Sequence, residues 1–189
     1  MAEVQSRLAE AELVIIGDGP LKAELQQLAR EKLRRYRFLG IQPPEVVRHW
    51  MNRAKAFSTP SVKARSGWME AFGMVFAEAQ AMCLPVVSFN SGGIPEVVAD
   101  GETGFLAPER NVEALAHDLR LILEDPQLFV HMGEAGRRRV CEKFDLRRQT
   151  QRLEQLYMQV LGIKLDRTGP QGGAEHQREQ PFAALDSRA

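Results

Sequence analysis

Cysteine is scarce in this 189-residue chain, which contains Cys83 and Cys141 alone. They lie far apart and show no Cys-x-x-Cys or Cys/His spacing, which argues against a disulfide framework and a zinc site. No stretch approaches the run of about 18 apolar residues that a membrane-spanning helix needs. The N-terminal residues are charged and resemble no export signal. We therefore expect a cytoplasmic protein, with at most peripheral contact at the inner face of a membrane.

The chain also lacks an excess of charge of either sign, because 25 Lys and Arg residues balance 25 Asp and Glu residues. No overall positive field is available to attract nucleic acid. The arginine-rich stretches 137–139 and 147–148 spread around predicted helices, which is typical of a solvated face. The histidines show no metal-ligand or triad spacing: His49, His117, His131 and His176. A small or neutral ligand fits this composition best.

Short apolar runs alternate with helical patterns along most of the chain. We predict strands over residues 13–16, 37–39, 56–59, 85–89 and 104–107, and main helices over 21–33, 44–51, 74–82, 112–123, 126–141 and 145–162. Parallel strands need crossover connections, so this alternation predicts an α/β domain with a doubly wound parallel sheet covered on both faces. We assign residues 1–164 to that domain. Residues 165–189 contain too few apolar side chains to offset ordering entropy, so we expect a disordered tail.

The stretch most informative about chemistry is residues 67–79, where a loop leads into a helix. The first turn of a helix offers unpaired N–H groups and roughly half a unit of positive charge, and Gly73 lets a ligand approach this backbone closely. A diphosphate suits such a place. Glu70 lies just before the helix and Glu78 about one turn inside it. Both carboxylates can therefore accept hydrogen bonds from the paired hydroxyls of a sugar and a ribose in one elongated ligand.

Two glutamates alone are usually solvated surface residues, but here they belong to an ordered series of motifs over residues 11–160. The series reads Val-Ile-Ile-Gly-Asp-Gly-Pro, Phe-Leu-Gly, Glu-Ala-Phe-Gly-Met-Val, Leu-Pro-Val-Val and Gly-Gly-Ile-Pro-Glu-Val-Val. It resembles the C-terminal, Rossmann-like domain of the retaining GT-B glycosyltransferases of family 4. The signature of that family is two glutamates separated by seven residues, and Glu70 and Glu78 stand at this spacing.

The resemblance implies that Glu70 acts near the reacting centre of a donor sugar, by positioning and charge stabilisation. It implies a donor site formed by Gly17, Phe72, Gly73, Met74, Val75 and Glu78, with Glu78 on the ribose. The donor would be a UDP- or GDP-sugar, and the acceptor a lipid-linked glycan, a polysaccharide or a small molecule. The family uses no cofactor and no bound metal, and this sequence has no Asp-x-Asp motif.

The chain departs from this family at its N-terminal end. Family members begin the domain with a strand ending in Gly-Arg, followed by Lys, and these cations bind the diphosphate. Here the first strand, residues 13–16, corresponds to the family's second, and residues 1–11 to the end of the preceding helix. We therefore expect a sheet that lacks its central first strand and has two unpaired edges. The missing N-terminal domain would come in cis or from another chain.

This departure leaves a second function open, a non-catalytic remnant or nucleotide-sugar-binding module. On either account we expect the isolated chain to be inactive. Two smaller departures are Ala71 and Cys83, each at a position where glycine is common. Cys83 follows the predicted helix 74–82. A left-handed backbone at that position would be mildly strained for a residue other than glycine.

Overall fold

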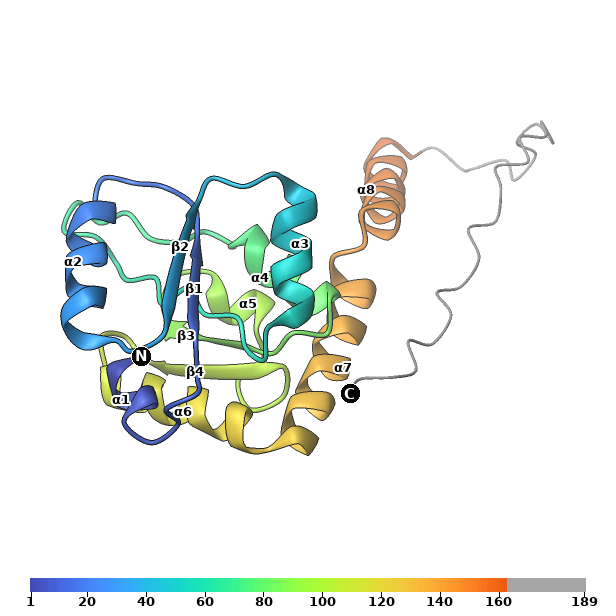
Figure 1. Cartoon of the computed structure of the whole chain (residues 1–189). Coiled ribbons are helices and arrows are strands. Elements are labelled where there is room, and N and C mark those ends of the chain that lie inside the picture. The colour runs from blue at the N-terminus through green and yellow to red at the C-terminus, as the bar shows by residue number, and fades with distance from the viewer. Residues whose placement is uncertain (163–189) are drawn as a thin grey trace. The chain divides into compact units, whose positions relative to one another are not determined.

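The computed structural model describes residues 1–162, and the predicted tail 165–189 lies outside them. The chain divides into two compact units, residues 1–149 and a unit that begins at Thr150. In chain order the elements are α1 (Ala2–Gln5), β1 (Leu13–Ile16), α2 (Lys22–Lys32), β2 (Tyr36–Gly40), α3 (Pro44–Arg53), α4 (Met74–Ala81), β3 (Val86–Asn90), α5 (Ile94–Val97), β4 (Gly104–Pro108), α6 (Val112–Glu124), α7 (Pro126–Lys143) and α8 (Leu146–Leu161) (Figure 1). The predicted alternation of strands and helices is confirmed.

All strand pairing in the described residues is parallel, and it forms two separate pairs. β1 pairs with β2 from Leu13 opposite Tyr36 to Ile16 opposite Gly40, and β3 pairs with β4 from Val86 opposite Gly104 onward. Figure 1 shows the β1–β2 pair between α2 and α3. The α/β class with parallel strands is therefore as predicted, but the sheet is not continuous.

The break in the sheet falls where the sequence predicts the missing strand. Of the predicted strand 56–59, Phe57 alone forms a bridge, to Val86 in β3. Among residues 1–162, β1 pairs with β2 and with nothing else. In the doubly wound order 3-2-1-4-5-6, β2 and β1 then take places 3 and 2, and the Phe57 segment takes place 4. The described residues leave place 1 unfilled, between β1 and the Phe57 segment.

The β3–β4 pair has helices on both faces. Val86 and Leu106 face a buried cluster that includes Phe76 of α4 and Ile94 of α5. The neighbouring Val87 faces the opposite way, into a second cluster with α1, α6 and α7. This alternation follows from the two-residue period of a strand, and because both faces are covered, β3 is buried from Val86 to Phe89. The four residues of β1, by contrast, are half-buried.

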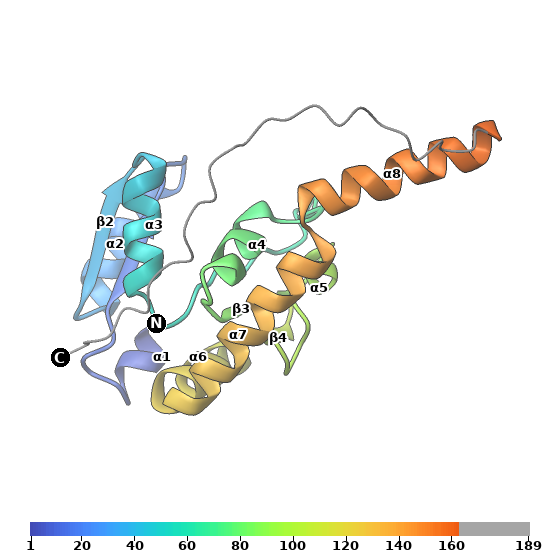
Figure 2. The ribbon, with the colours of Figure 1, turned by 90° about the vertical axis from the view of Figure 1, so that its right-hand side faces the viewer.

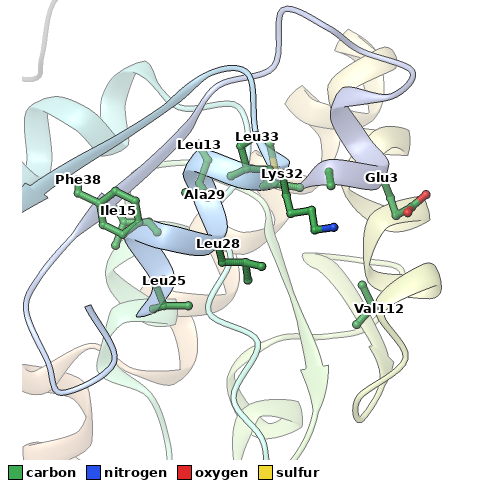
Figure 3. Close-up of a pocket in the computed structure, with 12 residues that line it drawn as sticks. Glu3, Leu13, Ile15, Leu25, Leu28, Ala29, Lys32, Leu33, Phe38 and Val112 are labelled. Atoms are coloured by element: carbon green, nitrogen blue, oxygen red, sulfur yellow. The ribbon is translucent and has the colours of Figure 1, made fainter. Parts of the chain in front are cut away.

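The leucine stripe of α2 lines an open cavity rather than a closed core. Leu25 and Leu28 remain 42% and 50% exposed. They border a cavity of about 340 Å³ whose lining also includes Leu13 and Ile15 of β1, Phe38 of β2, residues of α1, and Val112 (Figure 3). The helix predicted at 21–33 is thus confirmed. Its apolar side is covered incompletely, and α1, which lines part of the cavity, is four residues long.

Two of the clustered arginines hold helix ends rather than forming a solvated face. Arg137 donates to the carbonyl of Ala81, the last residue of α4, at 2.7 Å. Arg139 donates to the carbonyls of Glu96 and Val97 at the end of α5, at 2.8 and 2.9 Å. Cations are favourable at helix C-termini because the final carbonyls are unpaired and carry partial negative charge. These contacts fasten α7 to α4 and α5, and Figure 2 shows α7 running beside α4.

Cys83 has the left-handed backbone that its position predicts, with φ of 56°. The N–H of Leu84 bonds the carbonyl of Ala79, and that of Cys83 bonds Gln80, so α4 ends in a Schellman-type cap. We expect Cys83→Gly to raise the free energy of unfolding by about 0.5–1 kcal/mol, because glycine removes the left-handed strain. Urea unfolding of both proteins measures this difference.

A matched substitution within a helix should have the opposite sign. Cys141 lies in α7 and is exposed, so Cys141→Gly should lower stability by about 1 kcal/mol. A loss of stability in Cys83→Gly would show that the thiol contributes more by packing than the backbone loses by strain.

Candidate functional site

A pair of glycines seats the loop that carries Glu70. The carbonyl of Glu70 accepts a hydrogen bond from the Gly93 N–H at 2.8 Å. A Cβ on Gly93 would lie 1.8 Å from the carbonyl oxygen of Ala71, and one on Gly92 would lie 2.2 Å from that of Glu70. No side chain fits at either distance. The two glycines after β3 therefore allow the backbone of the turn to contact the backbone of Glu70 and Ala71. This contact fixes the position of Glu70.

The N-terminus of α4 directly follows this loop. Its N-cap is Gly73, with φ of 76°, and neither a side-chain cap nor an acidic residue of the first turn satisfies its N–H groups. A Cβ on Gly73 would lie 2.4 Å from the ring of Phe76. Within residues 1–162, no protein group accepts from the N–H of Met74 or Val75. Two such N–H groups, together with the dipole of the helix, have the chemistry that favours an anion.

Glu70 has a half-buried side chain that bends toward the same turn. Its Oε1 accepts from the Phe72 N–H at 3.3 Å. The ring of Phe72 packs edge-on against Phe144, with centroids 5.1 Å apart. Phe72, which the resemblance places in the donor site, thus directs its N–H to the Glu70 carboxylate and orients that carboxylate.

Glu78 lies on α4 and is exposed. Met74 and Val75, at one helical turn or less from it, are 66% and 40% exposed. Residues three and four apart share one face of a helix. Glu78 therefore shares a helix face with the side chains of Met74 and Val75, the two residues that follow the N-cap of α4 after the Glu70 loop.

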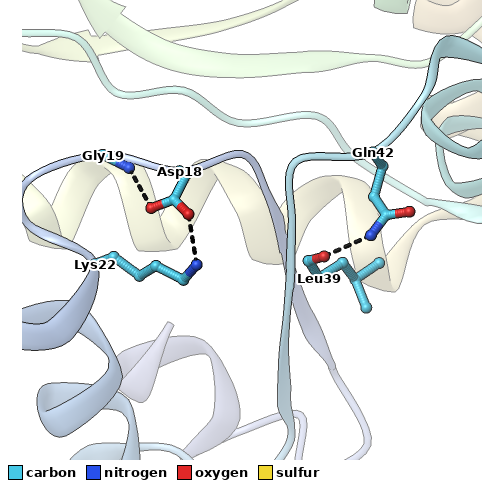
Figure 4. A network of polar contacts seen from close by, with 5 residues as sticks. All are labelled: Asp18, Gly19, Lys22, Leu39 and Gln42. Atoms are coloured by element: carbon cyan, nitrogen blue, oxygen red, sulfur yellow. Dashed lines mark hydrogen bonds and ion pairs between the residues drawn. The ribbon is translucent and has the colours of Figure 1, made fainter.

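Gly17 follows the carboxyl end of β1 and so belongs to the other strand pair. Its φ is 131°, and its N–H donates to the carbonyl of Gly40 at 2.8 Å. Next to it, Asp18 accepts from the Gly19 N–H at 2.8 Å and from Lys22 Nζ at 2.7 Å (Figure 4). The hydrogen bond from Lys22 lowers the pKa of Asp18, and the Gly19 bond adds to this effect. The pair keeps a cation at the start of α2, where the helix dipole alone disfavours one.

Glu109 and Arg110 hold the Glu70 loop from its other side, which the sequence pattern did not predict. Glu109 accepts from the Lys63 N–H and from Ser91, and Arg110 donates to the Lys63 carbonyl. Their contacts join segments 46 and 18 positions apart. The local pattern shows nothing beyond a charged pair before Asn111, the N-cap of α6. The left-handed backbone of Arg110, with φ of 67°, is visible in the structure alone.

No cluster of three or more metal-ligating side chains occurs in the part of the chain that the structure describes. Among the same residues, no helix is long and apolar enough to cross a membrane.

Comparison with known proteins identifies the family. The family model for glycosyl transferases group 1 matches residues 1–139. N-acetyl-alpha-D-glucosaminyl L-malate synthase of Bacillus anthracis is 31% identical over 154 residues, which are 80% of this chain and 38% of that protein. GDP-mannose-dependent alpha-(1-6)-phosphatidylinositol monomannoside mannosyltransferase of Mycolicibacterium smegmatis is 32% identical over 160 residues, 82% of this chain and 42% of that enzyme. The chain belongs to the glycosyl transferases of group 1.

A solved structure shows which part of such an enzyme the fold matches. The C-terminal domain of a glycosyl transferase group 1 family protein (LpcC) from Francisella tularensis superimposes with a TM-score of 0.65 at 23% identity, covering 77% of each chain. This chain spans about two fifths of the length of the curated relatives described above. Its fold is that of a GT-B C-terminal half.

Proposed function

We propose that this chain is the nucleotide-sugar-binding part of a retaining glycosyltransferase that moves a sugar from a UDP- or GDP-sugar to an acceptor. The observation that carries the proposal is the end of α4, where two unpaired N–H groups lie between the Glu70 loop and the exposed Glu78. The name of the mycobacterial relative, a GDP-mannose-dependent enzyme, supports a nucleotide-sugar donor. The acceptor would be a lipid-linked glycan, a polysaccharide or a small molecule.

Each residue has a part in holding the donor. The diphosphate binds the N–H groups of Met74 and Val75, and Gly73 leaves room for its approach. Glu78 accepts from the ribose hydroxyls, and the Gly17 turn lines the nucleotide. Glu70 accepts from the sugar near the reacting carbon and stabilises positive charge that develops there as the diphosphate leaves. Departure and attack on one face of the sugar retain the anomeric configuration without a covalent intermediate on Glu70.

The site requires a further segment on its open side. Among the described residues, β1 and the Phe57 segment both have an edge free of strand partners, and the cavity beside α2 is apolar and open. A parallel strand with an amphipathic helix would pair both edges and cover the exposed leucines. We propose that such a segment, carrying diphosphate-binding cations and the acceptor-binding domain, is supplied in cis or by another chain. "Completed protein" below means the chain together with it.

The completed protein should release nucleoside diphosphate from a sugar nucleotide in the presence of EDTA. The α4 dipole, its N–H groups and the added cations balance the diphosphate charge, so no divalent metal is needed. A panel of UDP- and GDP-sugars, assayed for released nucleotide with and without chelator, measures this. Complete loss of activity on chelation would refute the metal-free assignment.

A second function is that of a non-catalytic remnant or nucleotide-sugar-binding module. The absence of the Gly-Arg and Lys positions from residues 1–162 favours it. The coding sequence upstream of Met1 decides between the two. An in-frame Gly-Arg…Lys segment preceded by another Rossmann-like half supports the enzyme, whereas a stop codon supports the remnant.

A lipid acceptor, as in the mycobacterial relative's name, would also bring the enzyme to a membrane surface.

A further inference from the structure

The loop over residues 61–72 is held at both of its ends. At one end the Gly92–Gly93 turn seats the backbone of Glu70 and Ala71. Between its ends the loop makes a tight turn, in which Ala64 N–H bonds the carbonyl of Trp68 at 2.8 Å. The tip is exposed, and Trp68 keeps 70% of its accessible surface. Contacts at the other end therefore decide whether the loop keeps one conformation.

Glu109 forms the contact at that end. Its Oε1 accepts from the Lys63 N–H at 3.1 Å, and its Oε2 accepts from Ser91 Oγ at 3.0 Å. Ser91 is 5% exposed and immediately precedes Gly92. One carboxylate thus connects the beginning of the loop to the same turn that seats its end. Hydrogen bonds to a charged acceptor are stronger than those between neutral groups.

Arg110 also contacts Lys63, at its carbonyl, whereas Glu109 contacts its N–H. Its Nη2 donates to the Lys63 carbonyl at 3.2 Å, and its Nε lies 3.6 Å from Glu109 Oε1. Arg110 has a φ of 67°, a left-handed backbone that a residue with a Cβ adopts only under strain. Backbone strain at a non-glycine residue persists where the side chain makes contacts that glycine cannot make. Here that contact is the hydrogen bond to the Lys63 carbonyl.

We propose that Glu109 and Arg110 are positioning residues, which clamp the loop 61–72 and so hold Glu70 where the donor sugar binds. The part that concerns the donor rests on the function proposed above. The part that concerns the loop rests on the four contacts of Glu109 and Arg110 alone. Glu109 and Arg110, which directly follow β4, thus hold a loop that begins more than forty residues earlier in the sequence.

Trypsin cleavage of the native 189-residue chain after Lys63 and Arg65 tests the clamp without any ligand. In Glu109→Ala, cleavage at these sites should be about tenfold faster, because two hydrogen bonds that close the loop are lost. Glu109→Gln should restore most of the protection, since an amide accepts from Lys63 and donates to Ser91. Glu113→Ala, at an exposed glutamate four positions on, should cleave at the wild-type rate. Equal cleavage of Glu109→Ala and wild type would overturn the clamp.

Arg110→Gly separates the clamp from general stability. Glycine relieves the left-handed strain, so the melting temperature should stay the same or rise, while cleavage after Lys63 becomes faster. If Arg110 only contributed to overall stability, faster cleavage after Lys63 would be accompanied by a lower melting temperature. Faster cleavage with an unchanged or higher melting temperature supports the clamp. Slower or unchanged cleavage overturns the part assigned to Arg110.

Binding of UDP-glucose and GDP-mannose to the completed protein, with the same substitutions introduced into it, tests the link to the donor. Affinity of the sugar nucleotide that the wild type binds should fall several-fold in Glu109→Ala and return in Glu109→Gln. Unchanged affinity with faster cleavage overturns the donor part of the inference. If the wild type binds neither nucleotide, the proposed function and the donor part fail together, while the cleavage result still decides the clamp.

Discussion

Gly93→Ala is expected to lower the free energy of unfolding of the chain by about 3 kcal/mol and to displace the Glu70 loop. The added Cβ would lie 1.8 Å from the carbonyl oxygen of Ala71, and that atom belongs to a backbone rather than to a flexible side chain. The loop would have to move away. It would then lose the hydrogen bond from the Gly93 N–H to the carbonyl of Glu70.

A matched glycine provides the control for this prediction. Gly19 has no atom within 4 Å of an added Cβ and no left-handed φ. Gly19→Ala should therefore stay within about 0.5 kcal/mol of wild type. Urea unfolding of the three proteins measures the difference. Equal stability of Gly93→Ala and Gly19→Ala would mean that the loop does not rest on the glycine turn.

Where structure follows from local chemistry, the sequence was a sufficient guide. The run Leu-Val-Ile-Ile predicts β1 to the residue. Asn111 accepts from the Ala114 N–H at 3.0 Å, as an N-cap does. The left-handed Cys83 follows from its place after a helix end. Each of these features depends on a few neighbouring residues.

Features that depend on distant residues were predicted less well. The run 56–59 has strand composition, but among the described residues it forms a single bridge, from Phe57 to Val86. The stripe on α2 has helical spacing, yet what covers it is decided by α1 and Val112. The break in the sheet was foreseen because the first predicted strand corresponds to the family's second.

The candidate site shows the same division. The sequence predicts that Glu70 lies just before a helix and Glu78 about one turn inside it, and α4, which begins at Met74, confirms both placements. That Phe72 turns its N–H to the Glu70 carboxylate did not follow from the pattern. Nor did the reason for the Gly92–Gly93 pair, which is contact between two backbones. The roles of these residues toward a donor remain predictions.

Glu70→Ala should lower kcat of the completed protein by about 100-fold or more. Its carboxylate interacts most strongly with positive charge that is present in the transition state and not in the bound donor, so its loss falls on turnover. The contacts that seat the loop involve the backbone of Glu70, so the variant should fold as the wild type does. Glu78→Ala should instead raise KM for the donor with a smaller effect on kcat, since a ribose contact is the same in both states.

Steady-state turnover of these variants, each with unchanged melting temperature, tests the central claim that the end of α4 is the donor site. Glu102→Ala, at an exposed glutamate in the turn before β4, serves as the control and should match wild type. The account predicts a loss of about two orders of magnitude in kcat for Glu70→Ala under these conditions. Near-wild-type turnover of a folded Glu70→Ala would contradict it and place the chemistry elsewhere.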